Sequence, residues 1–251
     1  MGKRSMAGTV FWVSLAMILY SIIGFPLLCF LLEIFFKKRN IPEDYYPNVS
    51  VVVAAYNEEH IIAQKIENLL AQDYPLEKLE IIVVSDASVD RTNEIVKQYE
   101  GKGVKLLALQ ERTGVSEAFH HGVMASSGDI LMFTDATGMF SRNSLKKLMR
   151  WFRDPKVGGV CGRDSYENEA DSSTGQGWSL YIDYENWLRN LEGRLFSPIV
   201  VTGSIHAIRR PFHRRVPSQY TNDLVTPLTV LKEGYEVRFE PEAVITDKPE
   251  S

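Results

Sequence analysis

Between Asn48 and Phe133, short apolar runs alternate with longer segments in which apolar residues recur at helical spacing. Short runs rich in valine and isoleucine predict buried strands, and the 3.6-residue period predicts amphipathic helices. The predicted strands are Val49–Ala55, Glu80–Ser85, Val104–Leu109 and Asp129–Phe133. The predicted helices between them are Glu58–Gln72, Asp90–Gly101 and Ser116–Ser126. This alternation predicts an α/β fold in which right-handed crossovers build a mainly parallel sheet.

The alternation stops after Trp151, and the rest of the chain is expected to be less regular. It opens with a polar stretch, Arg163–Gly177. The elements expected after it are an aromatic-rich helix over Trp178–Glu192, a helix from Thr221 or Asn222 to about Gly234, and a strand at Ala243–Thr246. Threonine and asparagine are both favourable N-cap residues, which is why the second helix is expected to begin there.

The first part of the chain is almost wholly apolar from Thr9 to Phe36, and the basic run Lys37-Lys38-Arg39 follows it. A membrane span is expected, because a helix of roughly 20 apolar residues can cross a bilayer. A cleaved signal peptide is the alternative, but its apolar core usually has only about 7–15 residues. The basic cluster after the run favours a globular part in the cytoplasm. We expect an anchor over 1–39, a linker over 40–47 and a globular domain over 48–251.

Composition narrows the classes of function. The chain has 28 basic and 32 acidic residues and a net charge of -4, which argues against a nucleic-acid-binding surface. Cys29 and Cys161 lack the spacing of metal ligands. We interpret them as small buried thiols, consistent with a reducing compartment.

Polar side chains follow the first two predicted strands where each strand ends. Ala54, Ala55, Tyr56 and Glu58 close or follow the first strand, and Asp86 follows the second. Nucleotides bind at the carboxyl ends of strands in open α/β sheets. Small residues let a base and ribose approach the backbone, and an aspartate can accept the N3–H of uracil, so uridine is favoured. The alternatives are a helix-dipole role for the glutamate and a turn role for the aspartate.

A third polar group, Asp135-Ala136-Thr137, follows the fourth predicted strand. A carboxylate at a strand end can bind a divalent cation that bridges a diphosphate and neutralises charge as the leaving group departs. Asp135 is therefore a candidate ligand for Mg²⁺ or Mn²⁺. A capped turn is the alternative.

Taken in order, these motifs resemble those of family 2 glycosyltransferases, and the resemblance covers about Pro47 to Pro249. It implies a GT-A fold, which is a nucleotide-sugar-binding, Rossmann-like fold with a mixed, mainly parallel sheet, together with a UDP-sugar donor and Mg²⁺ or Mn²⁺. The aromatic segment that contains Tyr184 and Trp187 is similar to one in the membrane polysaccharide-synthase branch. That branch implies a polysaccharide or lipid-linked acceptor at a membrane.

The resemblance also assigns roles in the second half of the chain. Thr221-Asn222-Asp223 is similar to the family signature that ends in the catalytic base, so Asp223 is expected to accept the proton of the attacking hydroxyl in a single, inverting displacement. Its local alternative is a helix cap. Gly203, His206 and Asn222 are expected on the acceptor side; for the histidine, packing within a strand is the alternative.

The chain departs from the family pattern in three places. Val115 stands where the family has a lysine, and His120 where it has an asparagine. Thr137 replaces the second carboxylate of the Asp-x-Asp motif. The sequence also ends at Ser251, before the Gln-x-x-Arg-Trp segment and the further membrane helices of the synthases, so it resembles a relative that is short at its C-terminus.

The leading hypothesis is a single-pass, membrane-anchored, inverting glycosyltransferase. Its domain would comprise a nucleotide-binding half, 48–137, and an acceptor-side half, 138–251. The rival is a non-catalytic or truncated nucleotide-sugar-binding subunit of a membrane synthase, acting with a partner subunit. A nicotinamide-dependent oxidoreductase shares the strand pattern, but the sequence lacks the Gly-x-Gly-x-x-Gly turn after the first strand.

Overall fold

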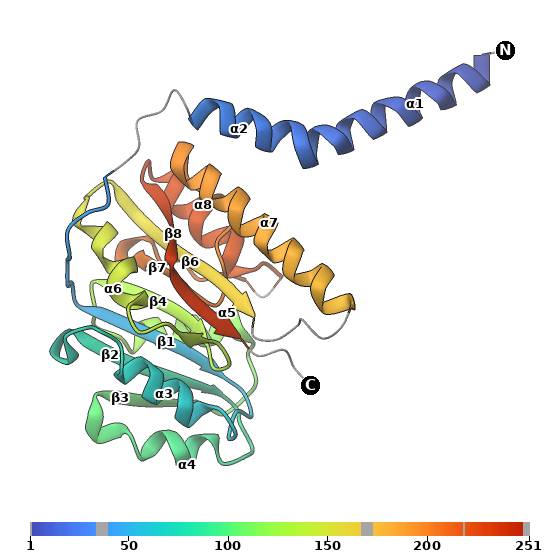
Figure 1. Cartoon of the computed structure of the whole chain (residues 1–251). Helices are drawn as coiled ribbons and strands as arrows, with labels where there is room; N and C mark the ends of the chain where they lie inside the picture. The colour runs from blue at the N-terminus through green and yellow to red at the C-terminus, as the bar shows by residue number, and fades with distance from the viewer. Residues whose placement is uncertain (1, 34–39, 167–172, 218, 248–251) are drawn as a thin grey trace.

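The computed structural model describes residues 2–33, 40–166, 173–217 and 219–247, and side chains over 6–32, 40–165, 184–217 and 219–247. One eight-stranded sheet forms the core, with strand order β3-β2-β1-β4-β7-β6-β8-β5. The strands are β1 (Val49–Ala55), β2 (Leu79–Asp86), β3 (Val104–Leu109), β4 (Ile130–Asp135), β5 (Met139–Phe140), β6 (Val157–Tyr166), β7 (His206–Arg209) and β8 (Glu236–Asp247). β1 to β4 pair in parallel, as do β6 and β8, whereas β7 runs antiparallel to its neighbours. The prediction of a mixed, mainly parallel sheet is confirmed (Figure 1).

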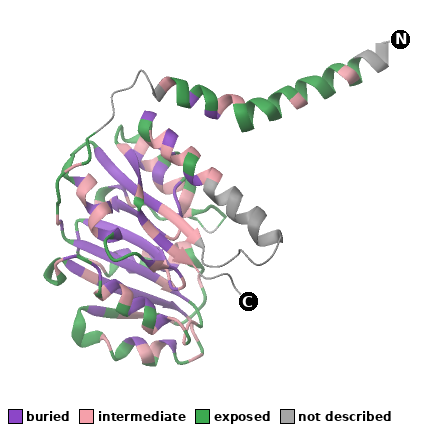
Figure 2. Ribbon diagram, viewed as in Figure 1, coloured by how far each residue is buried: buried purple, intermediate pink, exposed green. Residues whose placement is uncertain are grey.

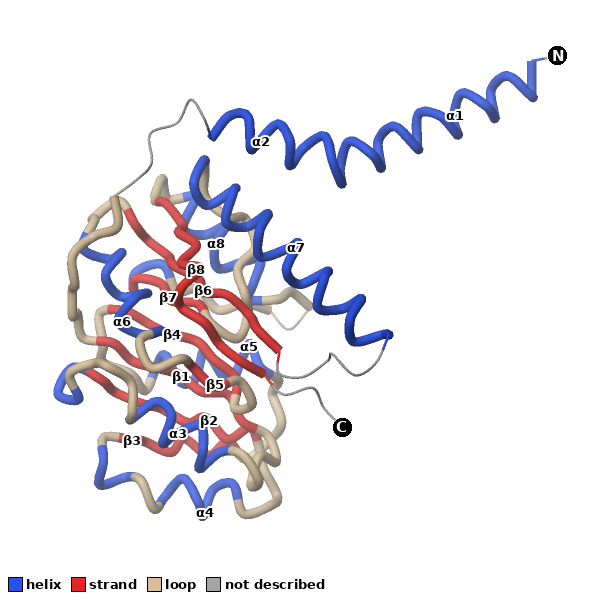
Figure 3. Tube along the Cα trace, in the orientation of Figure 1, coloured by secondary structure: helices blue, strands red, loops and turns tan. Residues whose placement is uncertain are grey.

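Helices cover both faces of the sheet (Figure 3). They are α3 (Ile62–Leu70), α4 (Thr92–Lys97), α5 (Val115–Met124), α6 (Ser144–Met149), α7 (Ser173–Leu195) and α8 (Asn222–Lys232), with short 3₁₀ turns at Leu76–Lys78, Glu100–Lys102, Arg150–Arg153 and Arg210–Phe212. Apolar residues of α3, α4 and α6 pack in one core cluster, and those of α5 and α8 pack in the other. α7 joins the second layer, where Gly193 lies against Phe239. Buried residues concentrate along the strands between these layers (Figure 2).

The strands of the first half lie close to where the sequence predicts them. Both faces of β1, β2 and β4 are covered and their valines and isoleucines are buried, whereas the edge strand β3 is only partly covered. The helices are shorter than predicted. α3 begins at Ile62 instead of Glu58, since the backbone N–H of Glu58 donates to Thr92, the first residue of α4, and that of Glu59 donates to Asp90 in the loop before it. α5 approaches β1 so closely that a Cβ at Gly122 would lie 2.3 Å from a methyl carbon of Val52.

The expectation of irregular structure after Trp151 is wrong. Residues 163–166 of the polar stretch belong to β6, and the predicted strand at 243–246 is the end of the longer β8. β6 and β8 pair along most of their length although they are distant in sequence. The alternation of apolar and polar residues is hard to recognise in β8 because the charged residues Arg238 and Glu240 are buried. Glu240 accepts hydrogen bonds from Arg150 and Trp151. The aromatic-rich helix α7 begins at Ser173, earlier than predicted, and residues 167–172 lie outside the described part.

The N-terminal apolar segment forms α1 (Gly2–Leu19), a π-helical turn (Tyr20–Gly24) and α2 (Phe25–Glu33). By length and composition, Met6–Leu32 can cross a membrane. The helix bends between α1 and α2, and α2 lies beside α7 (Figure 1). The basic run 37–39, on which the predicted orientation depends, lies outside the described residues. Cys29 and Cys161 are both free and buried, as predicted.

Candidate active site

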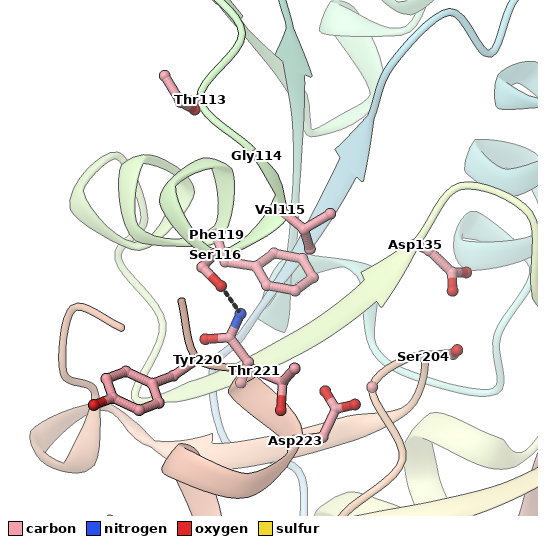
Figure 4. A pocket seen from close by; sticks show the side chains of 12 residues that line it. Thr113, Gly114, Val115, Ser116, Phe119, Asp135, Ser204, Tyr220, Thr221 and Asp223 are labelled. Atoms are coloured by element: carbon pink, nitrogen blue, oxygen red, sulfur yellow. Dashed lines mark hydrogen bonds between the residues drawn. The ribbon is translucent and has the colours of Figure 1, made fainter. Parts of the chain in front are cut away.

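A cavity of about 420 Å³ lies at the carboxyl ends of the parallel strands (Figure 4). The start of α5, the end of β4, the segment before β7 and the start of α8 enclose it. Its lining residues are Thr113, Gly114, Val115, Ser116, Phe119, Asp135, Gly203, Ser204, Tyr220, Thr221, Asn222 and Asp223. Three predicted site residues of the second half, and the predicted cation ligand, therefore line one cavity.

The loops after β1 and β2 are tied together next to this cavity. The Asn57 backbone N–H donates to the Ser88 hydroxyl at 3.0 Å, and the Asn57 side-chain oxygen accepts from the backbone of Val89 at 2.9 Å. Asn57 and Ala87 both have left-handed backbones, with φ of 56° and 59°, a conformation that costs free energy for residues other than glycine. The cross-links hold the two loops as one edge that carries Tyr56, the predicted nucleotide-binding residue, and lies beside Asp86.

Asp86 holds the start of α5 in place. Its Oδ1 accepts from the Thr113 backbone at 2.7 Å and from the Thr113 hydroxyl at 2.9 Å, and its Oδ2 accepts from the Gly114 backbone at 2.8 Å. The residue is buried. An ionised carboxylate has about four acceptor positions, so these three bonds leave one on Oδ2. Asp86 thus shapes the site and keeps one acceptor position.

Tyr56 offers a flat surface at the same edge. Its ring is 38% exposed, and the Arg112 guanidinium stacks on it with 3.8 Å between the guanidinium carbon and the ring centroid. Arg112 therefore lies over Tyr56 and is not among the residues that line the cavity. At the cavity itself, the position of the family lysine is held by Val115. None of the described lining residues is a lysine or arginine.

Asp135 lies on a turn that a buried lysine clamps from behind. Asp135 Oδ1 accepts from the Gly138 backbone at 3.1 Å. Lys65 is completely buried; its Nζ donates to the Thr134 hydroxyl at 2.8 Å and to the Gly138 carbonyl. Burial lowers the pKa of Lys65 to about 7, although the nearby charges of Asp135 and Asp247 raise it. Sequence reasoning missed this lysine; its position on the apolar face of α3, between Ile62 and Ile66, was the available signal.

The chemistry of this turn suits a cation that is only partly held by protein. Mg²⁺ commonly uses one or two carboxylates and completes its shell with water and substrate phosphates. Asp135 supplies one carboxylate, and Thr137 donates its hydroxyl to Asp247 at 3.1 Å. Within the described ranges, no group of three His, Cys, Asp or Glu side chains could hold a metal ion alone. The residues fit a site that the diphosphate would complete.

Asp223 lies in the first turn of α8, against the turn that precedes β7. Its backbone carbonyl accepts from Val201 at 3.0 Å. A Cβ at Gly203 would lie 2.9 Å from Asp223 Oδ1, so only glycine leaves the carboxylate where it is. The side chain of Asn222 donates to the Ser116 hydroxyl at 3.0 Å and so joins the starts of α8 and α5 (Figure 4). Thr221 occupies the N-cap position but makes no side-chain capping bond.

His206 is fully buried behind the cavity. Its Nδ1 lies 3.0 Å from the Thr202 carbonyl and 3.2 Å from the Gly203 carbonyl, so we place the proton on Nδ1, donating to both. Its ring stacks on Phe133 at 5.1 Å between centroids. Burial lowers the pKa of His206, and the charge of Asp223 opposes that shift. This geometry is that of a packed strand histidine that holds the turn carrying Gly203.

Two further residues, which the sequence reasoning left without a role, support the same turn. Arg189 of α7 donates to the Thr202 hydroxyl at 2.6 Å. Asp164 of β6 lies close by; burial raises its pKa to about 6, against the effect of Arg189 and of a hydrogen bond with Thr202. The turn is thus held from β7, β6 and α7 together.

Comparison with known proteins agrees with this architecture. The sequence profile described as "Glycosyl transferase family 2" matches residues 50–216, more than half of the chain. The chain belongs to glycosyltransferase family 2. Members of the family transfer a sugar from a nucleotide-sugar, and the predictions of a GT-A fold and of membership of this family are confirmed.

Curated relatives point to the predicted branch of the family. The chain is 28% identical over 260 residues to "Probable glycosyltransferase YdaM" of Bacillus subtilis (strain 168), which covers 95% of this chain and 61% of the relative. It is also 28% identical over 244 residues to "Poly-beta-1,6-N-acetyl-D-glucosamine synthase" of Staphylococcus aureus (strain COL), covering 91% of this chain and 57% of the relative. The chain therefore spans about three fifths of the length of these relatives.

Solved structures share the fold. A mannosyltransferase from Pyrobaculum calidifontis in complex with GDP-Man and Mn²⁺ superposes with a TM-score of 0.76 at 26% identity, covering 91% of this chain and 66% of that one. Staphylococcus aureus TarS 1–349 in complex with UDP-GlcNAc superposes with a TM-score of 0.62 at 18% identity, covering 81% and 59%. The second likeness shows the fold alone.

Proposed function

We propose that this glycosyltransferase is anchored in a membrane by Met6–Leu32, faces the cytoplasm, and moves a sugar from a UDP-sugar to a hydroxyl of a polysaccharide or lipid-linked acceptor with inversion. The observation that carries the proposal is that Asp135 at the end of β4 and Asp223 in the first turn of α8 line one cavity of about 420 Å³. Two carboxylates in one cavity give a place for the diphosphate and a base for the acceptor.

The nucleotide would bind at the edge beside the cavity, formed by Ala54, Ala55, Tyr56, Glu58 and Asp86. None of these five is among the lining residues of the cavity itself. Ala54 and Ala55 end β1 without bulk, so a ribose can approach the backbone. Tyr56 with Arg112 offers a stacking surface for a base. The acceptor position left on Asp86 Oδ2 suits the N3–H of uracil. These contacts support uridine, while the Mn²⁺ and GDP-Man in the Pyrobaculum structure make guanosine the alternative base.

Asp135 would hold Mg²⁺ or Mn²⁺ together with the diphosphate oxygens. When bound, the cation supplies the positive charge that stabilises the departing nucleotide. The need for it is strong here, because the described lining residues include neither lysine nor arginine. The clamp of Lys65 on the turn keeps the Asp135 carboxylate in a fixed position, which favours a preorganised site.

At the other end, Asp223 would accept the proton of the attacking hydroxyl as the bond to the anomeric carbon forms. Gly203, held by His206, leaves room beside the carboxylate, and Asn222 fixes the start of α8 against α5. A base on the side of the cavity away from the diphosphate supports a single displacement, which inverts the anomeric configuration.

The departures at Val115 and Thr137 support a second hypothesis. In it, the chain is a nucleotide-sugar-binding subunit that acts with a partner and does not transfer sugar. Both hypotheses require nucleotide binding at the same cavity. They differ in whether Asp223 is used, so binding and transfer have to be measured separately on the same preparation.

The test is calorimetry of the full chain in detergent with UDP and with GDP, each with and without Mn²⁺, followed by incubation with a UDP-sugar and a hydroxyl acceptor. We expect Mn²⁺-dependent binding that is tighter for UDP than for GDP, and a product of inverted configuration by NMR. Tighter binding of GDP would overturn the base assignment. Binding without transfer would favour the rival.

A further inference from the structure

The structure shows an apolar surface beside the acceptor end of the cavity. Exposed apolar side chains occur on α7, in the segment that follows it and along the outer side of α8. They are Trp187, Phe196, Ile199, Val200, Leu224 and Leu228. We call these six residues the apolar face. Leu224 and Leu228 are one helical turn apart on α8, and Val200 adjoins them because the neighbouring residues Val201 and Asp223 share a backbone hydrogen bond of 3.0 Å.

The N-terminal helix packs on the same part of the domain. Cys29 of α2 forms a core cluster with Leu191 and Leu195 of α7, against which Phe25 and Leu32 also pack. The Tyr184 hydroxyl donates to the carbonyl of Ile22 at 2.9 Å. The two helices therefore run side by side in the same direction, and α7 is the part of the domain nearest to the candidate span (Figure 1).

The length of the apolar helix shows where a membrane would end. Between Met6 and Gly24 no residue is buried. α2 is covered by α7 along one side, where Cys29 is buried, and keeps Leu27, Leu28, Phe30 and Leu31 exposed on the rest of its surface. At 1.5 Å per residue the part from Met6 to Gly24 is about 28 Å long, close to the roughly 30 Å thickness of a bilayer's hydrocarbon core. The part before the bend at Tyr20–Gly24 is therefore long enough to cross the hydrocarbon core, and the exposed apolar side chains of α2 would lie at the bilayer surface. Tyr184 and Trp187 of α7 lie at that level, where aromatic residues are enriched in membrane proteins.

We infer that the apolar face lies against the lipid bilayer, so that α7 rests on the membrane surface and the acceptor end of the cavity opens beside it. The path from the membrane to the reaction is short: α2 packs on α7, Arg189 of α7 bonds Thr202, and the adjoining Gly203 touches Asp223. The edge of the sheet formed by β2 and β3, on the sugar-donor side, points away from the apolar face.

The position of the apolar face also indicates the class of acceptor, and this part of the inference rests on the proposed function. An acceptor that reaches Asp223 from the membrane side would have its hydroxyl in the polar cavity and its remainder at the bilayer surface. That geometry favours a membrane-bound amphiphile over a freely soluble sugar. The contact of the apolar face with lipid, in contrast, does not depend on catalysis.

The test is spin-label accessibility on the full chain reconstituted in phosphatidylcholine and phosphatidylglycerol vesicles. Ile199→Cys and Leu228→Cys probe the apolar face; Val89→Cys and Leu76→Cys are matched controls, exposed apolar positions on the distant side of the sheet. Both native cysteines are buried, so labelling is directed to the introduced ones. We expect the ratio of collisions with oxygen to collisions with a water-soluble nickel chelate to be several-fold higher at 199 and 228 than at 89 and 76.

Equal ratios at all four positions would overturn the inference. Spin–spin broadening at 199 and 228 that disappears on dilution with unlabelled chain would also overturn it, because a second copy would then cover the face. UDP binding is measured on the same vesicles. Loss of UDP binding with preserved lipid contact would refute the proposed function and leave the membrane placement intact.

Discussion

The two halves of the sheet acquire their structure in different ways. β1, β2 and β3 are parallel neighbours in chain order, joined by local crossovers, and β4 completes this half beside β1. β6, β7 and β8 pair with strands that are far away in the sequence, including β7 with β4. The first half therefore sets the nucleotide edge by local order, whereas the second half positions Asp223 through contacts between distant segments. Changes in the two halves should separate binding from transfer.

Gly203→Ala should have the largest effect and should act on transfer alone. The added Cβ would lie 2.9 Å from Asp223 Oδ1 and would displace the carboxylate. A displacement of about 1 Å can cost roughly 100-fold in rate, so we expect a loss of about that size with unchanged UDP affinity. Gly101→Ala is the control, because a Cβ there would meet nothing within 4 Å. Equal losses of UDP affinity and of transfer in Gly203→Ala would show that nucleotide binding and transfer do not depend on separate halves of the domain.

Val115→Lys should raise the affinity for UDP, the function assigned to the first half. The side chain of Val115 is 59% exposed and lines the cavity, which has no lysine or arginine among its described lining residues. A charge-assisted contact to the diphosphate is worth about 1.5–3 kcal/mol, so UDP measured by calorimetry without divalent cations should bind about tenfold or more tightly. Leu76→Lys, at an exposed position away from the cavity, controls for net charge. Unchanged affinity would place the diphosphate elsewhere.

Lys65→Met should have a smaller effect, visible in the pH dependence of stability. Burial lowers the pKa of Lys65 to about 7 in the folded chain, from its ordinary value of 10.5, so between those pH values the unfolded chain holds more protons. Stability from this group therefore rises with pH above 7. Without divalent cations, the unfolding free energy of the parent should rise relative to the variant by up to about 2 kcal/mol between pH 7 and pH 9.

Urea unfolding of both proteins in detergent at the two pH values measures this difference. The charges that face Lys65 are those of Asp135 and Asp247, which the parent and the variant both carry. Lys102→Met, an exposed lysine, is the matched control and should leave the pH dependence unaltered. If the unfolding free energies of Lys65→Met and of the parent change equally with pH, Lys65 keeps its proton in the folded chain and the prediction is wrong.

The sequence predicts the first half well because the information there is local. Val49–Ala55 is apolar on both faces and ends in small residues, so its strand, its end and its neighbours follow from the pattern. It does not predict that Asp86 also holds the start of α5, since that depends on where the 112–114 loop folds back. Lys65 was missed for a related reason, because only the packed structure shows that its side chain has no route to solvent.

In the second half, motifs were easier to predict than structure. Thr221-Asn222-Asp223 and the glycine at 203 stand out by their residues, yet the strand β6 that carries Asp164 does not. Its partner β8 lies far along the chain, and buried charges such as Glu240 interrupt the apolar alternation. The contact between Gly203 and Asp223 follows only once these pairings are made.

The central claim is that Asp135 serves the nucleotide and Asp223 serves the acceptor within one cavity. The most direct test compares Asp135→Ala and Asp223→Asn with the parent, measuring Mn²⁺-dependent UDP binding by calorimetry and sugar transfer on the same preparations. Glu233→Gln, an exposed carboxylate just past the end of α8, is the control. We predict that Asp135→Ala loses the Mn²⁺-dependent binding, whereas Asp223→Asn binds UDP as the parent does and loses transfer by at least about 100-fold. Loss of UDP binding in Asp223→Asn, or full binding in Asp135→Ala, would contradict the account.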